Sequence, residues 1–542
     1  MTSTPLTSNL VTDEPDSIGQ PPEAFDAIAA LDIGTNSFHL VVARPGPDGF
    51  EVVTREKEMV RLGETGSQMK TISTAALDRS VAALARMRRL AESSGASSIR
   101  AVATSATREA QNAGDFIERA RSEAGVDIEV ISGVEEARLI YLGILQAVPV
   151  FEQRALCIDI GGGSTELLIG RRSEVLVVRS LKLGAVRLTE RFFPDGELSG
   201  RSIRECREYI RSMLTHFARE SRREGFDEVI ASSGTAESVA RMIQHARAES
   251  DLHTYNCYAF SADEVHAITE TVCAARSTTQ RTKIPGLEAN RADIAPAGVL
   301  ILDEVINTLG IESLTFSEGA LREGVLLDTL QRRSALSTSA FTLPSLHDVT
   351  ARSVRQLQER CDEDPFHSNH VAGLATGLFD HLEQILALDA DAKRYLSAAA
   401  RLANVGLVVS HSRHHHHSYY VIRNSELAGL TDHEIELIAQ IARYHRKSAP
   451  KQSHQPFAQL SGEDQRLVRS LAAVLRVAIG LDRSHEQRVI GLRADTDDDR
   501  IRIHVRSASS ADIALELYAA NDRKALLEEV CGRRIELLQA IA

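Results

Sequence analysis

The chain has 542 residues, of which 43% are hydrophobic and 25% are charged, an ordinary composition for a soluble globular protein. This length exceeds what one hydrophobic core supports, so we expect several domains. The formal net charge of −13 argues against broad nucleic-acid binding, and no run approaches the roughly 20 apolar residues that cross a bilayer. Six scattered cysteines without a CxxC pair predict free thiols and a cytoplasmic protein.

The first part of the chain predicts two α/β lobes in tandem. Residues 1–24 lack a basic start and an apolar segment, so we expect a disordered leader rather than a signal peptide. Strand-like runs IAALDIG, HLVVARP and FEVVTREKEMVRL then precede an amphipathic helix over 74–93, strand IRAVAT, helix TREAQNAGDFIERARSEAG, strand IEVIS and helix VEEARLIYLGILQAV. At Ala155 a similar order of elements begins again. We therefore expect lobes over 25–150 and 151–335, an organisation shared by actin, sugar kinases and the seventy-kilodalton heat-shock proteins.

Each lobe opens with an apolar strand that ends in an aspartate and continues into a hairpin. The turn residues are Gly34, Thr35, Asn36 and Ser37 in the first hairpin and Gly161, Gly162, Gly163, Ser164 and Thr165 in the second. Glycines let backbone N–H groups approach an anion closely, and hydroxyl and amide groups add further donors. Two such hairpins, about 130 residues apart, predict two lobes that hold one phosphorylated ligand in the cleft between them.

Acidic side chains beside these hairpins predict a divalent cation, with Mg²⁺ as the expected ion. Asp32 and Asp159 end the two matched strands, and Glu166 follows the second hairpin. A carboxylate next to a phosphate is repelled unless a metal lies between them, and Mg²⁺ prefers few carboxylates and several waters. Stabilisation of a turn is the alternative role of each aspartate.

Two adjacent glutamates begin the helix in ISGVEEARLIYLGIL. Ser132 and Glu135 have the spacing of a capping box, in which the serine caps the helix and the glutamate reaches back. Glu136 has no such structural role. It is either a general base that faces the cleft or a solvated residue of the first helical turn.

Several basic side chains are candidates for binding an anion. Arg108 lies at a strand-to-helix junction, where it either clamps a phosphate or pairs with Glu109 or Asp115, and Arg138 is equally ambiguous. Arg55, Lys57 and Arg61 follow the first hairpin and form either a polyanion groove or a solvated strand edge. A further turn, Ser232 to Thr235, resembles one that approaches the nucleoside in two-lobed proteins that use ATP, but its pattern is weak.

The C-terminal part predicts two smaller domains after a linker over 332–346. Periodicity makes 346–485 almost entirely helical. The segment 486–542 reads as a small α/β unit, with strand-like runs RVIGLRAD and DRIRIHVRS and a closing helix KALLEEVCGRRIELLQAIA. His370, His411, His414 to His417 and His445 indicate either a metal site or a polar loop, and the polar loop is favoured.

With these residues in hand, the chain resembles the exopolyphosphatase/guanosine pentaphosphate phosphohydrolase (Ppx/GppA) family, in its long four-domain form. The motifs are LDIGTNSFHLVVAR, ATREAQNAGDF, ISGVEEARLIYLG, IDIGGGSTEL, ASSGT, FSEGALREGVL, VGLVVSHSRHHHHSYYVIRNSEL and ARYHRK, which together span about 27–450. The resemblance implies a catalytic glutamate at Glu136, metal-associated acids at Asp159 and Glu166, phosphate turns at the two hairpins and a basic cleft residue at Arg108. It also implies an HD-like helical domain, although Ala403-Asn404 replaces the His-Asp pair, so a second metal site is not expected.

The resemblance implies hydrolysis of a terminal phosphoanhydride bond, first of all in inorganic polyphosphate. Guanosine pentaphosphate (pppGpp) is the alternative substrate within the family. An ATP-dependent kinase of the same fold and a non-catalytic sensor are more distant alternatives. A homodimer that extends the substrate groove is also expected from the resemblance.

Overall fold

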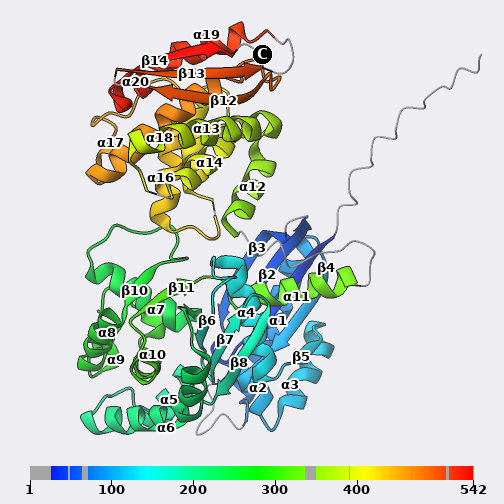
Figure 1. Ribbon diagram of the computed structural model, residues 1–542. Helices are drawn as coiled ribbons and strands as arrows, with labels where there is room; N and C mark the ends of the chain where they lie inside the picture. Colours follow the sequence, from blue (N-terminus) through cyan, green and yellow to red (C-terminus); the bar gives the residue numbers. More distant parts are fainter. Residues whose placement is uncertain are drawn as a thin grey trace, which may run out of the picture.

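The computed structural model describes residues 26–46, 49–63, 71–335, 349–389, 391–425, 427–497, 499–507 and 512–540. The predicted leader and residues 336–346 of the predicted linker lie outside these ranges. In Figure 1 the two sheet-containing lobes lie side by side, and the helical region with the C-terminal sheet lies beyond one end of them.

The first lobe is built on a five-stranded sheet with the order β3-β2-β1-β4-β5. Its strands are β1 (Ala27–Ile33), β2 (Ser37–Gly46), β3 (Gly49–Met59), β4 (Ala96–Ala103) and β5 (Ile128–Val130). The first three strands run antiparallel as a meander, whereas β4 and β5 are parallel to β1. Nearly every residue of β1 is buried, because this central strand is covered on both faces.

The helices of the first lobe agree with the prediction except for one interruption. α1 (Thr74–Ser93) has the predicted bounds and is capped by Ser73. The expected single helix after β4 is instead α2 (Ser105–Glu109), α3 (Ala113–Arg119) and one π turn (Ala120–Ala124). α2 ends because Ala110 adopts an extended conformation. α4 (Gly133–Ala147) then completes the lobe.

The second lobe repeats this arrangement in a six-stranded sheet with the order β10-β11-β9-β6-β7-β8. Its strands are β6 (Ala155–Ile160), β7 (Thr165–Arg171), β8 (Glu174–Leu181), β9 (Glu228–Ser232), β10 (Ala259–Ser261) and β11 (Ser313–Ser317). Its helices are α5 (Ala185–Phe192), α6 (Gly200–Glu224), α7 (Ser233–Ala246), α8 (Ala262–Ala274), α9 (Thr278–Arg281) and α10 (Ala295–Leu309). Strands β8-β7-β6-β9-β11 correspond in order to β3-β2-β1-β4-β5, so the duplication predicted from the sequence is present in the topology.

Helix α11 (Leu321–Ala335) returns to the first lobe, although the predicted boundary grouped it with the second. It packs along α4 and against β1 and β2 (Figure 1). Glycines make this close approach possible, because a Cβ on Gly143 would lie 1.9 Å from the Ala320 carbonyl oxygen and one on Gly324 would lie 1.7 Å from the Leu139 carbonyl oxygen. The chain therefore crosses between the lobes twice, and both crossings meet at the α4–α11 pair.

The helical region and the C-terminal sheet share one hydrophobic core, which includes Leu378, Leu471, Val505 and Ile535. Its helices are α12 (Val349–Cys361), α13 (Pro365–Leu386), α14 (Ala392–Leu402), α15 (His414–Arg423), α16 (Asp432–Arg443), α17 (Gln455–Ala458), α18 (Gly462–Gly480), α19 (Ala514–Arg523) and α20 (Ala525–Cys531). The sheet has the order β12-β13-β14, formed by β12 (Val489–Thr496), β13 (Arg500–Ser507) and β14 (Arg534–Gln539).

The predicted closing helix is wrong in its second half. α20 ends at Cys531, and Gly532 follows in a left-handed conformation with φ of 62°, as is common after a helix. The segment RIELLQ then forms β14, which pairs in parallel with β13. Its alternating buried residues, Ile535 and Leu537, fit a half-buried strand.

The C-terminal end of α4 is a junction of three parts of the molecule. The Ala147 carbonyl oxygen accepts hydrogen bonds from Asn256 Nδ2 of the second lobe (2.8 Å) and from the Gly429 backbone N–H of the helical region (3.0 Å). Arg352 of α12 donates to the neighbouring Gln146 carbonyl oxygen over 3.1 Å. Thus the carbonyl groups at the end of one helix are satisfied by residues from two other domains.

Candidate active site

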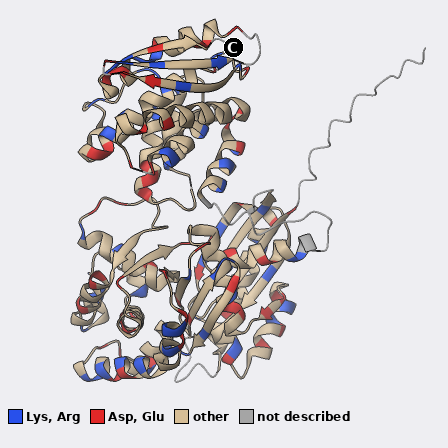
Figure 2. Ribbon diagram, viewed as in Figure 1, with Lys and Arg blue, Asp and Glu red and all other residues tan. Residues whose placement is uncertain are grey.

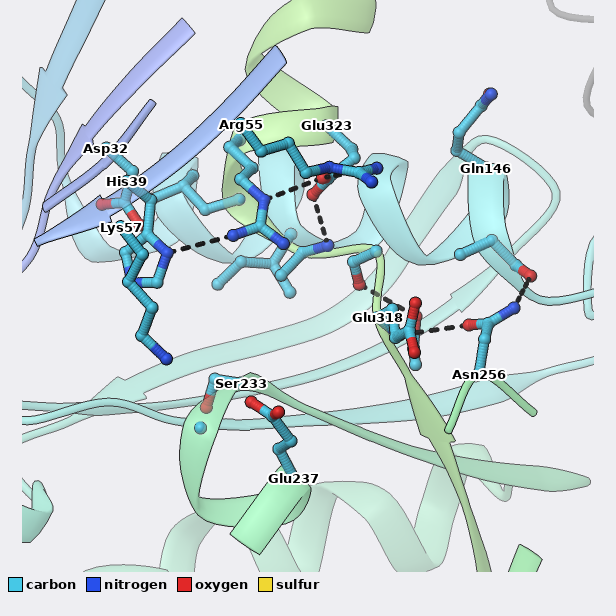
Figure 3. Close-up of a pocket in the computed structure, with 18 of the residues that line it drawn as sticks. Asp32, His39, Arg55, Lys57, Gln146, Ser233, Glu237, Asn256, Glu318 and Glu323 are labelled. Atoms are coloured by element: carbon cyan, nitrogen blue, oxygen red, sulfur yellow. Dashed lines mark hydrogen bonds and ion pairs between the residues drawn. The ribbon is translucent and has the colours of Figure 1, made fainter. Parts of the chain in front are cut away.

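A cavity of about 1150 Å³ lies between the two lobes and continues to the helical region. Both hairpins line it, as do α12 residues such as Gln356 and Arg360 and the segment after α15. In Figure 3, Asp32, His39 and Lys57 border one side of the cavity, while Ser233 and Glu237 border the opposite side. A cleft between two duplicated lobes therefore exists as the sequence predicts.

The tips of the two hairpins touch each other. A Cβ on Gly163 would lie 2.6 Å from Ser105 Oγ and 2.8 Å from Thr35 Oγ1, and one on Gly162 would lie 3.1 Å from Thr35 Cβ. The second hairpin needs glycine at these positions because the first lobe leaves no room for a side chain. Arg187 reinforces this contact, donating from Nε to the Gly163 carbonyl oxygen over 2.7 Å and pairing with Glu109 of the first lobe.

The hairpins are equivalent in their backbone bonding. The Gly34 N–H donates to the Ser37 carbonyl oxygen over 3.2 Å, and the Gly161 N–H donates to the Ser164 carbonyl oxygen over 2.9 Å. All the predicted turn residues line the cavity except Thr165. The Thr165 side chain is fully buried and its hydroxyl donates to the Leu183 carbonyl oxygen over 2.6 Å, so it is a structural residue.

The aspartates of the two lobes have different partners on the adjacent strand. Asp159 faces Glu166 across β6 and β7, whereas Asp32 faces His39 across β1 and β2. Burial, followed by the positive charge of Arg322, lowers the pKa of His39 to about 3, so this imidazole is neutral. The duplication therefore places an acid in one lobe and a neutral base at the same position in the other.

Glu136 enters the cavity from the first turn of α4, and only 6% of the residue is exposed. Arg108 Nη1 donates to Glu136 Oε2 over 3.1 Å and to the Ile131 carbonyl oxygen over 2.8 Å. Burial raises the pKa of Glu136 to about 7, although the charge of Arg108 opposes the shift. Such a pKa suits a group that exchanges protons near neutral pH.

Arg108 lies at the predicted strand-to-helix junction, and both Arg108 and Arg138 form ion pairs. Arg108 is not among the described residues that line the cavity, and its partner is Glu136 rather than Glu109 or Asp115. Arg138 pairs with Glu135 and with Asp328 of α11, which gives it a structural role. The Ser132 hydroxyl caps α4 through the Glu135 N–H, but the Glu135 carboxylate pairs with Arg138 and does not reach back.

Three carboxyl groups, those of Asp32, Asp159 and Glu166, are buried together with Glu136. Burial and the charges of Glu136 and Asp159 raise the pKa of Asp32 to about 8. Burial also raises the pKa of Asp159, whose carboxylate accepts a hydrogen bond from Ser232 Oγ over 2.5 Å. Burial and the charges of Glu136 and Asp159 raise the pKa of Glu166 well above its usual range. The charges of Glu136 and Asp159 thus make ionisation of neighbouring carboxyl groups harder, which is the condition that a bound cation relieves.

The donor set fits Mg²⁺ only in part. Within the parts of the chain that the structure describes, no three His, Cys, Asp or Glu side chains gather closely enough to hold a metal ion. Asp32 and Asp159 line the cavity, but Glu166 does not, and its carboxylate accepts from Ser180 Oγ over 2.7 Å. An ion held by one or two of these carboxylates, waters and phosphate oxygens agrees with the preference of Mg²⁺. Magnesium therefore stays a prediction.

Two of the three residues predicted to form a polyanion groove line the cavity. Arg55 and Lys57, two residues apart on β3, both line the cavity, and Lys57 extends into it in Figure 3. Arg61 is not among the described lining residues; it pairs with Asp293 (3.1 Å) and donates to the Asn290 carbonyl oxygen. Figure 2 shows basic and acidic residues interspersed along the helices in view.

The sequence reasoning missed Arg322 and Arg291. Arg322 donates to His39 Nδ1 over 3.0 Å and pairs with Glu323 over 2.8 Å, and its charge acts on Asp32. It lies in FSEGALREG, which the sequence indicated only as a structural turn into a helix. Arg291 packs over the turn at Gly234, where a Cβ would lie 2.3 Å from Arg291 Nη1. No sequence pattern that we recognised pointed to Arg291. This residue lies in a short helical turn that is far along the chain from Gly234, which it covers in space.

Other predictions concern regions outside the cavity. All six cysteines are free. His414, the first residue of α15, and His445, in the turn after α16, are buried with their Nε2 atoms 3.3 Å apart, so these two are not part of an exposed polar loop. Ala403 is the C-cap residue of α14 and is buried. Among the described residues, no helix has both the length and the apolar character for crossing a membrane.

Sequence comparison connects this site to known proteins. A model of the Ppx/GppA phosphatase family matches residues 41–333, and one described as Ppx/GppA phosphatase, domain III, matches residues 349–522. The structure is similar to an exopolyphosphatase from Cytophaga hutchinsonii, with 29% identity and a TM-score of 0.54 over 56% of this chain and 98% of that chain. It is also similar to an exopolyphosphatase-like protein, with 27% identity and a TM-score of 0.52 over 57% of this chain and 99% of that one.

Proposed function

We propose, from the premise that this chain belongs to the Ppx/GppA phosphatase family, that it is an exopolyphosphatase, which releases orthophosphate from the end of inorganic polyphosphate. The observation that carries the proposal is the position of Glu136. Its carboxylate lines the same cavity as both phosphate-binding hairpins and is held by Arg108 at 3.1 Å. A base fixed beside a phosphate site is what attack by water on a terminal phosphoryl group requires.

In the proposed reaction, the two hairpins hold the terminal phosphoryl group. Their backbone N–H groups, with the side chains of Thr35, Asn36, Ser37 and Ser164, offer hydrogen bonds to its oxygens. Glu136 orients a water molecule and accepts its proton as the water oxygen bonds to phosphorus. The bond to the bridging oxygen breaks, and the shortened chain leaves as a phosphate anion. Alignment and neutralisation of charge are the main needs of phosphoryl transfer, and these groups supply the alignment.

The need to neutralise the negative charge of the phosphate chain supports our proposal that Mg²⁺ binds in this cavity. The carboxylates that line the cavity are Asp32, Glu51, Glu136, Asp159, Glu237, Glu318, Glu323 and Glu359, and the Lys and Arg side chains are Arg44, Arg55, Lys57, Arg291, Arg322 and Arg360. Since the acids outnumber the bases, a phosphate chain would enter together with cations. Asp32 and Asp159 are the lining residues that would hold Mg²⁺, which when bound would offset the charge of the phosphoryl oxygens.

The shape of the cavity favours a polymer over guanosine pentaphosphate. The cavity continues past Arg55 and Lys57 to Arg360 of the helical region, which gives an extended path for a repeating anion. At the turn that approaches a nucleoside in related folds, Arg291 already lies against Gly234. A guanine ring at this position would have to displace the half-buried Arg291 guanidinium. Hydrolysis of pppGpp at its 5′ end is the alternative within the family.

Direct assay of phosphate release separates these activities. Purified protein with Mg²⁺ is given long-chain polyphosphate, pppGpp or ATP with a sugar acceptor, and orthophosphate and sugar phosphate are measured. Polyphosphate should be the substrate with the highest kcat/KM. A higher kcat/KM for pppGpp would instead assign the alarmone activity, and sugar phosphate formation would assign a kinase.

We also infer that the protein is a homodimer, as its family resemblance implies. Sedimentation velocity over a range of protein concentrations tests this inference. A single species with the mass of one 59.2 kDa chain at all concentrations would contradict it.

A further inference from the structure

A second, smaller pocket lies in the helical region, at the first turn of α15. It has a volume of about 70 Å³ and is lined by His415, His416, Arg443, Tyr444, Lys447, Ser448 and His454. None of these residues lines the main cavity. The mechanism proposed above uses none of them, so their arrangement needs a separate explanation.

The Arg443 side chain packs against two aromatic rings and has no acidic partner in the part of the chain that the structure describes. Its guanidinium carbon lies 5.4 Å from the ring centre of Tyr419 and 5.3 Å from that of Tyr444. Its Nε atom is buried and has no hydrogen-bond partner among the described residues. Contacts with two aromatic rings fix a cation but do not neutralise it. A buried guanidinium nitrogen that lacks an acceptor indicates that an acceptor is missing from the site.

The histidines of the pocket, like Arg443, include a buried nitrogen atom without a hydrogen-bond partner in the described part of the chain. His415 is only 8% exposed, and its Nδ1 atom is buried without a hydrogen-bond partner. The ring of His416 lies 4.3 Å from the ring of His415, and His454 Nδ1 lies 2.9 Å from the Tyr444 hydroxyl oxygen. Burial and the charges of His416 and Arg446 lower the pKa of His415 to about 4.

Positive charge around the pocket is not balanced by acids. Asp and Glu are absent from its described lining residues. The neighbouring charges that lower the pKa values of His416 and His454, after burial, are those of Arg443 and other basic residues. This local excess contrasts with the net charge of −13 for the whole chain.

A metal ion does not fit this setting, although neutral histidines are common metal ligands. Arg443 and Lys447 line the pocket and would repel a cation. The first turn of α15, with no side chain capping it, also presents the positive end of a helix. Arginine, lysine, imidazole N–H and serine hydroxyl groups together are the donors that bind a phosphate.

We propose that this pocket is a binding site for a single phosphate group, separate from the catalytic cavity. A volume of about 70 Å³ is far below the roughly 300–1,000 Å³ of sites for whole small molecules, so a nucleotide does not fit inside it. The group is either free orthophosphate or the end of a polyphosphate chain. Helix α15 begins at this pocket and ends at Arg423, beside Asn424 and Ser425, which line the main cavity. If the proposed function is correct, orthophosphate and polyphosphate are therefore both present close to the pocket.

The test uses histidine modification in the full-length protein. Diethyl pyrocarbonate is added at pH 7, and peptide mass spectrometry follows modification of His416, which is exposed at the pocket, and of His433, which is exposed on α16 outside it. Orthophosphate at about ten times its Kd should slow modification of His416 about tenfold, because only the free site reacts, and should leave His433 unchanged. Rates at His416 that stay equal with orthophosphate, with polyphosphate and without either ligand would overturn the proposal.

A second arm distinguishes the two sources of phosphate. Long-chain polyphosphate is tested on the Glu136→Gln variant, with orthophosphate release measured in parallel. If orthophosphate protects His416 and polyphosphate does not, the site binds the free anion. If polyphosphate protects His416 at a lower phosphate concentration than orthophosphate does, the site binds the end of a chain. If neither protects His416, the pocket is not a phosphate site, whatever the enzyme hydrolyses.

Two variants tie protection to the pocket. Arg443→Gln removes the unpaired guanidinium, and Lys447→Gln removes an exposed charge whose loss does not threaten folding. Each should weaken protection of His416 severalfold, whereas Arg493→Gln, on β12, should not. Full protection by orthophosphate in a folded Lys447→Gln protein and in a folded Arg443→Gln protein would contradict the proposal.

Discussion

Arg108 Nη1 lies 3.1 Å from Glu136 Oε2, and this ion pair joins the end of α2 to the start of α4 at the edge of the cavity. The arginine also donates to the Ile131 carbonyl oxygen, so its direction is fixed by the backbone that precedes α4. The pair therefore sets where the Glu136 carboxylate points. Of the two residues, Glu136 is the one that lines the cavity.

Glu136→Gln should reduce kcat for phosphate release by about 10²–10⁴-fold, the usual contribution of a positioned general base. The amide keeps the size of the side chain but cannot accept a proton from water. The matched control is Glu135→Gln, because Glu135 pairs with Arg138 outside the cavity. A Glu136→Gln enzyme with wild-type kcat would remove Glu136 from the mechanism.

Activity should depend on pH through Glu136. With a pKa of about 7, the wild-type carboxylate is ionised above that pH, so the rate should rise with pH and level off at mildly alkaline pH. The charge of Arg108 lowers this pKa, so its removal in Arg108→Gln should raise it and move the rising limb to higher pH. The measurement is log kcat/KM against pH for both proteins, and an unchanged limb would show that Arg108 does not act through Glu136.

Gly163→Ala should separate the hairpin tips. The new Cβ would lie 2.6 Å from Ser105 Oγ and 2.8 Å from Thr35 Oγ1, which forces the two lobes apart where they hold the ligand. We expect a loss of roughly 1–3 kcal/mol in the free energy of unfolding, typical of overpacking, and a fall in kcat/KM of at least about tenfold. Gly114→Ala, with no atom within 4 Å of the added Cβ, is the control. Wild-type kcat/KM for Gly163→Ala would show that the hairpins need not touch.

Arg55→Gln and Lys57→Gln should weaken binding of long polyphosphate. Both side chains line the cavity on β3, so each loss should raise KM severalfold, and the effect should shrink at high ionic strength because exposed charges are screened. Arg61→Gln is the control from the same segment, since Arg61 pairs with Asp293 outside the cavity. The prediction fails if all three variants raise KM equally.

The helical region should lose stability in acid because of His445. Burial lowers the pKa of its imidazole well below the usual 6.5, so the unfolded chain binds this proton more readily than the folded chain. The stabilisation is complete above about pH 6.5 and decreases below it, by about 1.4 kcal/mol for each pH unit per proton. Urea unfolding followed by circular dichroism between pH 5 and 7.5 should show a smaller pH dependence in His445→Gln than in wild type. An equal dependence would mean that other groups control acid unfolding.

Local sequence patterns predicted much of this structure. The bounds of α1 follow from its apolar periodicity and the Ser73 cap, and the two hairpins follow from an apolar strand that ends in aspartate and glycine. The position of Glu136 in the first turn of α4 was predictable because the Ser132 cap fixes where this helix begins. These features are local, so a single sequence contains their causes.

Features that depend on distant contacts were missed. Thr165 belongs to a turn motif, yet pairing of β7 with β8 buries its side chain. Arg61 follows the same strand as Lys57 but turns to Asp293 of the other lobe. Arg322 reaches His39 only because α11 returns to the first lobe. None of these outcomes is encoded in the neighbouring residues, since each requires a segment far away in the chain.

The junction at Ala147 has a consequence for how substitutions in the helical region should be interpreted. Glu136 and Ala147 lie on one continuous helix, about 16 Å apart along its axis at 1.5 Å per residue. Gly429 and Arg352 bond to the far end of that helix. Because an α-helix moves as a rod, a tilt imposed at Ala147 also displaces the carboxylate at the other end. A substitution that alters catalysis from the helical region therefore need not touch the ligand.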